Sequence, residues 1–302
     1  MLTYTGRRNL YGSYTNTQST NLANGDTWMN NIERQILRFA NFASPALEKK
    51  DTSLTTTTSQ FRELPNNVGK VRTITVTVGT QVYTADEVNS EAEWQRLNQA
   101  SYTSDTVEKF FIRAGQFGLW PTPATAGNQI TIYHKPILKD LSIGDYTTGG
   151  VLTATNASTA IVGTGTTWTT SMAGRFIRIT ESDTANKGDG YWYEISSVTD
   201  STHLTLVKPY AGTSISAGNA AYTIGQVGLI PEDFQETPVL LATYKYWLGP
   251  GNNRAKAKEY KDLAAELLKA FFKEYSSKST SPVLDYGVGE VEPTNPNLYV
   301  TQ

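Results

Sequence analysis

The sequence predicts an α+β protein whose helical core, with a small antiparallel sheet, is interrupted by an all-β segment. Residues 1–148 and 227–278 carry amphipathic helical patterns and a few strands, whereas residues 149–226 carry strand signals with almost no helical period. Residues 279–302 show no regular period. We therefore expect a discontinuous core of 1–148 and 227–278, an inserted β-sandwich or barrel domain at 149–226, and an extended C-terminal arm at 279–302.

The composition fits a folded protein. Of the 302 residues 38% are hydrophobic, which is enough to bury a core in each of two domains. The 26 basic and 28 acidic residues give a net charge of −2, so the whole chain has no electrostatic preference for nucleic acid or anionic lipid. The sequence has no cysteine, which excludes disulfides and thiol nucleophiles. Without a secretory signal or a membrane-spanning stretch, the chain is expected to be soluble and assembled in a cytoplasm.

Helix and strand patterns alternate in the first half. After a polar lead, Asp26 is expected to cap a helix whose apolar face consists of Met29, Ile32, Ile36 and Phe39. Alternation over 71–84, with a turn at Gly79-Thr80, predicts a β-hairpin. Ser90 and Glu93 form a capping box that predicts a short helix at about 90–99.

A second hairpin is expected over 110–120, with its turn at Gly115-Gln116. Pro121 and Pro123 end this hairpin, and a further strand is expected over 130–133.

The segment 149–226 contains six strand candidates separated by Gly, Asp, Ser and Asn. They lie near 151–155, 159–162, 175–180, 190–196, 203–207 and 220–224. Trp168 and Met172 lie between strands and are expected to fill the core of this segment.

Two helices are expected in the second half. The first enters through Ile230-Pro231-Glu232-Asp233 and Thr237-Pro238, and runs to Leu248 with Leu241, Tyr244 and Leu248 as its buried stripe. After Gly249-Pro250-Gly251 the last helix begins at Asn252 or Asn253, and its apolar face consists of Tyr260, Leu263, Ala264, Leu267, Phe271 and Tyr275. Together they form an αα-hairpin.

No pattern in the sequence indicates catalysis, a cofactor or a metal. His134 and His203 have no acid and hydroxyl at motif spacing, so both are expected to be structural. Asp183 and Asp189 lie in a Gly/Asn-rich loop that lacks the oxygen ligands of a calcium loop. We expect the protein not to be an enzyme. The aromatic residues Trp168, Tyr191, Trp192 and Tyr193 leave open a glycan platform, although strand alternation sends about half of such residues into the core.

Charge is unevenly distributed near the C-terminus. Residues 252–278 carry seven basic and four acidic residues, a net charge of +3, whereas 279–302 carry Asp285, Glu290 and Glu292 and no basic residue. One interpretation is a solvated helix face followed by a solubilising tail. The other is an acidic arm that leaves its own helix and docks on a neighbouring subunit.

The order of several short motifs resembles a known family. They are Thr3-Tyr4-Thr5-Gly6-Arg7-Arg8-Asn9-Leu10-Tyr11-Gly12, Gly118-Leu119-Trp120-Pro121-Thr122-Pro123, Ile130-Thr131-Ile132-Tyr133-His134-Lys135-Pro136 and Ile230-Pro231-Glu232-Asp233-Phe234. In this order they resemble head-to-tail connector adaptor proteins of tailed bacteriophages, over most of 1–148 and 227–278. Gly163-Thr164-Gly165-Thr166-Thr167-Trp168 and Met172-Ala173-Gly174-Arg175-Phe176-Ile177 are similar to small β modules of phage structural proteins.

This resemblance implies a structural virion protein at the neck of the particle. It implies a homo-oligomeric ring, usually of twelve subunits, that lies below the portal protein, contacts tail or neck proteins and continues the channel for passing genomic DNA without sequence-specific binding. The arm would engage the portal through Leu284, Tyr286, Leu298 and Tyr299. The alternative is a tail or fibre-proximal binding protein whose β module grips a glycan or another virion protein.

Overall fold

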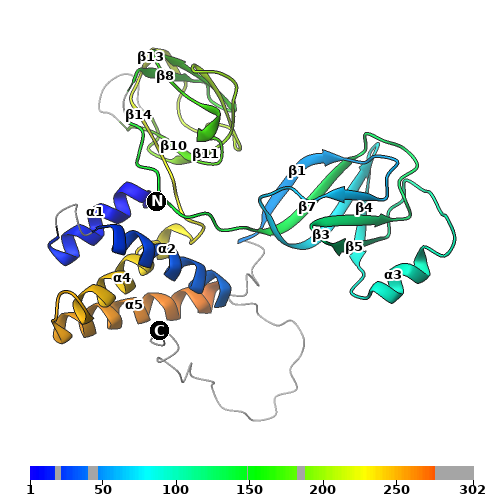
Figure 1. Ribbon diagram of the computed structural model, residues 1–302. Helices are drawn as coiled ribbons and strands as arrows, with labels where there is room; N and C mark the ends of the chain where they lie inside the picture. The colour runs from blue at the N-terminus through cyan, green and yellow to red at the C-terminus, as the bar shows by residue number, and fades with distance from the viewer. Residues whose placement is uncertain (18–21, 40–46, 148, 182–187, 276–302) are drawn as a thin grey trace.

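The computed structural model describes residues 1–17, 22–39, 47–147, 149–181 and 188–275. Within these ranges the chain forms a bundle of four long α-helices and two curled seven-stranded sheets, so the molecule is α+β (Figure 1). Each of these three units has its own cluster of buried apolar side chains.

The helical bundle joins the two ends of the sequence. Helices α1 (Tyr4–Thr15) and α2 (Leu22–Phe39) come from the N-terminal part, and α4 (Thr237–Leu248) and α5 (Arg254–Tyr275) come from the C-terminal part. A 3-10 turn, η4 (Glu232–Phe234), leads into α4. The side chains that fill this bundle come from all four helices and include Tyr11, Ile36, Val239 and Phe271.

The N-terminal part differs from the prediction in two ways. The polar lead is the helix α1, whose N-cap is Thr3. Asp26 is not an N-cap, because α2 begins four residues earlier at Leu22. Instead, Asp26 accepts a hydrogen bond from the hydroxyl of Tyr4 and forms an ion pair with Arg8, so it connects α2 to α1.

The C-terminal helix pair lies where the pattern predicted it, but its buried stripe is different. Leu248 is 47% exposed and Leu263 is 46% exposed. Every residue from Thr237 to Thr243 is buried, because the first two turns of α4 are surrounded by α1, α2 and α5. A single 3.6-residue stripe therefore does not describe α4.

The first sheet is larger than the small sheet expected from the sequence. Its strands are β1 (Lys49–Thr55), β2 (Phe61–Glu63), β3 (Val68–Val78), β4 (Gln81–Glu87), β5 (Lys109–Arg113), β6 (Gln116–Trp120) and β7 (Gln129–Pro136). Their order is β1-β7-β3-β4-β5-β6-β2, and only the β4–β5 pair is parallel. Strands β1 and β2 were not predicted. Since this sheet has a separate buried cluster, it is not a layer on the helical core.

Both predicted hairpins and the short helix are present in this unit. The turn between β5 and β6 consists of Ala114 and Gly115, one residue earlier than predicted, with φ of 50° and 80°. Helix α3 (Glu91–Leu97) forms without a side-chain hydrogen bond from Ser90, so the predicted capping box is wrong. The helix is held by Trp94, whose ring stacks on Phe111 at 5.3 Å between centroids.

The second sheet contains the six predicted strands, within two residues at each end, and one more. They are β8 (Val151–Ala154), β9 (Ala160–Thr164), β10 (Phe176–Ile179), β11 (Trp192–Val198), β12 (His203–Leu206), β13 (Ile215–Ala220) and β14 (Tyr222–Gly225), in the order β13-β8-β9-β12-β11-β10-β14. Strand β13 is the additional one. Trp168 and Met172 are buried as predicted, Met172 within the 3-10 turn η3 (Thr170–Met172), and the indole of Trp168 donates to the hydroxyl of Tyr222 at 3.0 Å.

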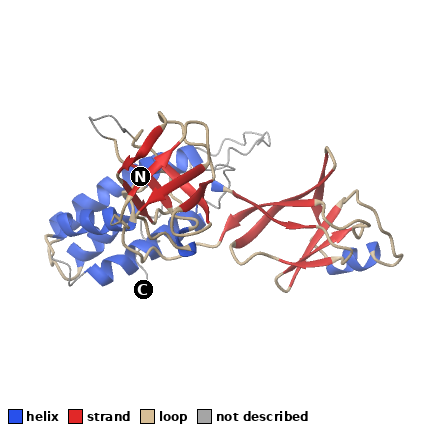
Figure 2. Cartoon of the chain, turned by 90° about the horizontal axis from the view of Figure 1, so that it is seen from above, coloured by secondary structure: helices blue, strands red, loops and turns tan. Residues whose placement is uncertain are grey.

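Two linkers, 137–147 and 226–231, connect the sheets to the bundle. Figure 2 shows the first sheet and α3 standing apart, while the second sheet lies over the helices. That residues 149–226 fold independently as an inserted domain stays a prediction. The predicted arm, 279–302, lies outside the described residues.

Candidate functional site

The candidate site is the junction where both linkers cross the bundle. It begins at the N-terminus of α1, where the Thr3 hydroxyl accepts the backbone N–H of Gly6 at 3.1 Å and donates to Asp145 of the first linker at 2.7 Å. A threonine at the N-cap is favoured because its oxygen satisfies a free amide of the first turn. Here the same hydroxyl also fixes the linker to the helix.

Further hydrogen bonds attach both linkers to α1. The Thr5 hydroxyl accepts the backbone N–H of Asp145 at 2.9 Å, and the backbone N–H of Tyr4 donates to the Gln226 carbonyl at 2.8 Å. The side-chain oxygen of Gln226 accepts the N–H groups of Ser142 and Ile143, at 2.9 and 2.8 Å. These bonds satisfy backbone groups of the linkers that no strand pairs.

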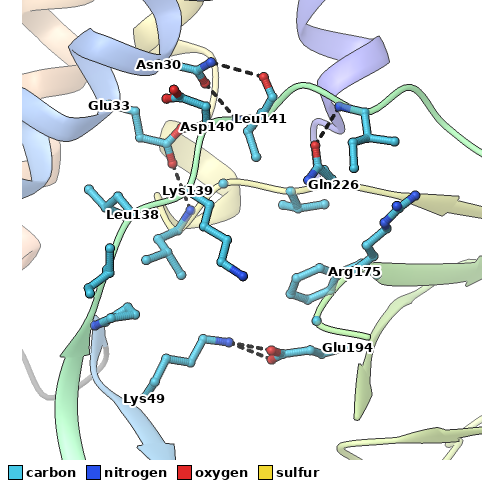
Figure 3. A pocket seen from close by; sticks show the side chains of 18 of the residues that line it. Asn30, Glu33, Lys49, Leu138, Lys139, Asp140, Leu141, Arg175, Glu194 and Gln226 are labelled. Carbon is cyan, nitrogen blue, oxygen red and sulfur yellow. Dashed lines mark hydrogen bonds and ion pairs between the residues drawn. The ribbon is translucent and has the colours of Figure 1, made fainter. Parts of the chain in front are cut away.

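Helix α2 holds the first linker through a reciprocal pair of bonds. The side-chain amide of Asn30 donates to the Leu141 carbonyl and its oxygen accepts the Leu141 N–H, both at 3.1 Å (Figure 3). One side chain therefore replaces a complete backbone pairing.

A buried ion pair lies beneath the second linker. Arg7 of α1 and Glu33 of α2 meet at 2.5 Å, with side chains 1% and 7% exposed. The other oxygen of Glu33 accepts the backbone N–H of Leu229 at 2.9 Å. A Cβ on Gly228 would lie 2.1 Å from Glu33 Oε1 and 2.4 Å from an Arg7 nitrogen, so only glycine allows this approach.

The N-terminus is tied to the entry of α4. The amino group of Met1 forms an ion pair with Glu232, and the Leu2 N–H donates to the side chain of Gln235. Burial lowers the pKa of the Met1 amino group, with a smaller contribution from the positive charge of Arg178. The N-terminus therefore lies against the entry of α4, more than 200 positions later in the chain.

A pocket of about 370 Å³ lies at this junction, lined by α2, both linkers, the start of β1 and the edge of the second sheet (Figure 3). Two ion pairs border it: Arg34 with Asp140, and Lys49 of β1 with Glu194 of β11 at 2.7 Å. The second pair joins the two sheets directly. Lys139 and Arg175 also line the pocket.

Arg175 is 8% exposed, and no hydrogen bond or ion pair joins its guanidinium to any residue that the structure describes. Burial lowers its pKa below the ordinary value.

The portal-docking residues predicted from the sequence lie outside the described residues, so their contacts stay a prediction: Leu284, Tyr286, Leu298 and Tyr299. The aromatic platform is not formed by the four residues considered for it. Trp168 and Tyr193 are core residues, and Tyr191 is 70% exposed. The structure therefore gives no support to glycan binding by this group.

The remaining candidate residues have structural positions. His134 is fully buried in β7, and His203 lies at the surface, where its ring contacts Asp200 at 3.0 Å. Asp189 accepts a hydrogen bond from the Tyr193 hydroxyl, and Asp183 lies outside the described residues.

The junction residues were not predicted as a site. One signal was present in the sequence: Glu33 lies four residues after Met29 and three before Ile36, so an acid interrupts the apolar face of α2. A buried acid requires a cationic partner, and Arg7 in the N-terminal motif supplies it.

A protein-family model described as SU10 adaptor protein matches residues 7–161, just over half of the chain. The match covers α1 beyond its first turn, α2, the whole first sheet, the first linker and β8, and it ends at the start of β9. The comparison with curated proteins gave no match. Among the described residues, no helix is both long and apolar enough for a membrane span.

Proposed function

Since the chain belongs to the SU10 adaptor protein family, a family of bacteriophage structural adaptors, we propose that it forms a ring below the portal that joins capsid to tail. As a phage adaptor the protein is located in the virion, where it contacts other virion proteins. The finer proposal is a ring of identical subunits, twelve in number, that lies at the neck, continues the DNA channel and is assembled in the host cytoplasm.

The observation that carries this proposal is the family match together with the convergence of the N-terminal motif and the Ile230–Phe234 entry. Met1 and Leu2 contact Glu232 and Gln235, so segments 231 and 233 positions apart build one bundle. A ring requires heterologous contacts that close by rotation, and a helical bundle with two attached sheets offers separate faces for such contacts. The role needs no catalysis, cofactor or metal.

The ring is tested by native mass measurement and negative-stain imaging of the protein alone and mixed with its portal. We expect a closed ring of uniform copy number on the portal. A chain that stays monomeric and unbound in both conditions would contradict the proposal.

The C-terminal segment is proposed to dock on the portal through its hydrophobic anchors. Truncation after Lys278 leaves every described residue in place, so the melting temperature is expected to stay unchanged while portal binding is lost. The matched control replaces Leu284, Tyr286, Leu298 and Tyr299 by serine in the full chain. Undiminished portal binding in both variants would refute this role of the segment.

A further inference from the structure

The junction pocket carries positive charge without a partner. Of its charged side chains, Glu33, Asp140 and Glu194 are paired with Arg7, Arg34 and Lys49. The side chains of Lys139 and Arg175 form no hydrogen bond or ion pair with any part of the chain that the structure describes. Figure 3 shows Lys139 extending from the first linker into the pocket, with Arg175 on the facing wall directly before β10 and its guanidinium directed away from Lys139.

The position of Arg175 has an energetic cost in the free subunit. Arg175 as a residue is 8% exposed, so its guanidinium is only partly hydrated, and no described group replaces the missing hydration. Burial of an unpaired cation is unfavourable, and a carboxylate is the group that a guanidinium binds most specifically. The pocket is therefore complementary to a carboxylate.

A duplex or single-stranded nucleic acid fits this pocket less well. Asp140 and Glu194 stand at its border, each paired with a cation, so the size of the pocket and not their charge decides between a nucleic acid and a peptide. A pocket of about 370 Å³ admits a few side chains of a peptide.

The last described residue of α5, Tyr275, lies next to η4, whose neighbours adjoin this pocket. Its ring packs edge-on against the ring of Phe234 in η4, with 6.0 Å between the ring centroids. Near Phe234 in the sequence, Pro231, Glu232 and Gln235 line a smaller pocket of about 180 Å³. That smaller pocket shares Lys49, Phe176, Val227, Gly228 and Leu229 with the junction pocket.

Length and charge of the acidic C-terminal segment match the site. Asp285 follows Tyr275 by ten positions, a reach of up to about 33–36 Å in an extended chain. Residues 279–302 carry Asp285, Glu290 and Glu292 and no basic side chain. A short tether also gives its own pocket a local concentration of the segment on the order of millimolar, well above that of other chains in dilute solution.

We propose that the junction pocket is a docking site for the acidic segment 279–302 of the same chain, which places separate carboxylates against Arg175 and Lys139 in the free subunit. This contact fixes the second sheet, which supplies Arg175, against the linker, which supplies Lys139. It uses the acidic residues of the segment and is therefore separate from portal docking through the hydrophobic anchors.

The test uses the full chain without portal, and it relies on the sequence having no native cysteine. Cysteines replace Ser171, an exposed residue that lines the pocket, and Gly289, next to Glu290. In a thiol redox buffer at low ionic strength, we expect a disulfide within one chain, quantified by mass measurement and non-reducing electrophoresis.

Two further variants of this cysteine pair address the charges. Arg175→Gln removes the proposed partner in the pocket, and Asp285→Asn with Glu290→Gln and Glu292→Gln neutralises the segment without touching the pocket. Each variant is expected to lower the effective concentration of one thiol at the other, as measured by disulfide formation, about tenfold or more. This is the loss expected when a charge-assisted hydrogen bond is removed. Raised salt is expected to act in the same direction.

The matched control is Arg178→Gln, which removes an exposed arginine of β10, three positions after Arg175, that does not line the pocket. It is expected to leave the disulfide unchanged. An unchanged disulfide in Arg175→Gln or in the neutralised segment overturns the proposal, and so does an equal loss in Arg178→Gln. Disulfides formed only between chains overturn docking within one chain and assign the pocket to a second copy.

Discussion

At the scale of single residues, the Arg7–Glu33 pair is the most sensitive point of the bundle. Arg7→Met leaves the Glu33 carboxylate buried with one remaining partner among the described residues, the N–H of Leu229. Removal of one member of a buried ion pair typically costs about 3–5 kcal/mol. We expect a loss of this size in the free energy of unfolding, measured by urea titration of the helical circular dichroism signal.

The neighbouring arginine supplies the control for this experiment. Arg8 is 34% exposed and pairs with Asp26, so Arg8→Met is expected to cost about 1 kcal/mol or less. The double variant Arg7→Met/Glu33→Gln is expected to recover part of the loss because it no longer buries an unpaired charge. Equal effects of Arg7→Met and Arg8→Met would show that the buried pair does not stabilise the bundle.

Gly228 carries the second prediction at this scale. A Cβ at this position overlaps the Arg7–Glu33 pair, so Gly228→Ala must displace the second linker from α2. Overpacking of this kind costs about 1–3 kcal/mol. In the first linker, a Cβ on Gly144 meets only the Thr5 hydroxyl, at 3.8 Å, so Gly144→Ala is the matched control. Thermal unfolding of both variants measures the difference, and equal melting temperatures would contradict the proposed close approach.

At the scale of elements, the β5–β6 hairpin contains a strained turn. Ala114 has φ of 50°, a conformation that asparagine and glycine adopt at lower cost than alanine. Ala114→Asn creates the Asn-Gly pair favoured in two-residue hairpins and is expected to stabilise the first sheet by about 0.5–1 kcal/mol. Urea unfolding followed by aromatic fluorescence of this unit measures the change. Ala124→Asn, in an exposed loop, is expected to have little effect on the free energy of unfolding. If it stabilised the protein as much as Ala114→Asn does, both gains would be assigned to general solubility and not to the turn.

The same elements show why sequence patterns succeeded for some segments and failed for others. Six of the seven strands of the second sheet were predicted because each alternates and is bounded by turn residues, whereas β13 was missed. Helix α1 was missed because its buried face consists of Arg7, Tyr11 and Thr15, of which two are polar. Strand β1 was missed because Lys49–Thr55 contains one apolar residue, Leu54, and lies at the edge of its sheet.

Local sequence patterns did not predict the junction, for a different reason. Its contacts join residues far apart in the chain, such as Lys49 and Glu194, 145 positions apart. Periodicity reports which face of an element is buried, and it does not report the partner of that face. Only the acid Glu33 on an apolar face gave a local sign of the site.

At the scale of the whole molecule, the linkers hold the three units together more firmly than the direct contact between the sheets. The Lys49–Glu194 pair is 36% and 29% exposed, and such pairs contribute about 0–1 kcal/mol. The linkers instead use several hydrogen bonds to Thr3, Thr5, Asn30 and Glu33. The position of each sheet therefore depends on bonds that the bundle itself makes.

The last prediction follows from this dependence. Within residues 147–226, most belong to the second sheet, whereas Gln226 completes the contacts of the bundle. Tyr146 and Ile224 exchange backbone hydrogen bonds at 2.8 and 2.9 Å, so the two ends of this unit lie side by side. Residues 147–223 can then be replaced by a Gly-Ser-Gly joint that keeps Gln226 on α1 and the linker. We expect this variant to keep the bundle and the first sheet, as measured by thermal unfolding and by hydrogen exchange of α1 amides.

Replacement of 147–226 by the same joint removes Gln226 and its bonds to Tyr4, Ser142 and Ile143, so α1 amides are expected to exchange faster. If the first variant fails to fold, the second sheet shares its stability with the bundle and is not a separable unit; if the two variants exchange alike, Gln226 does not hold the junction.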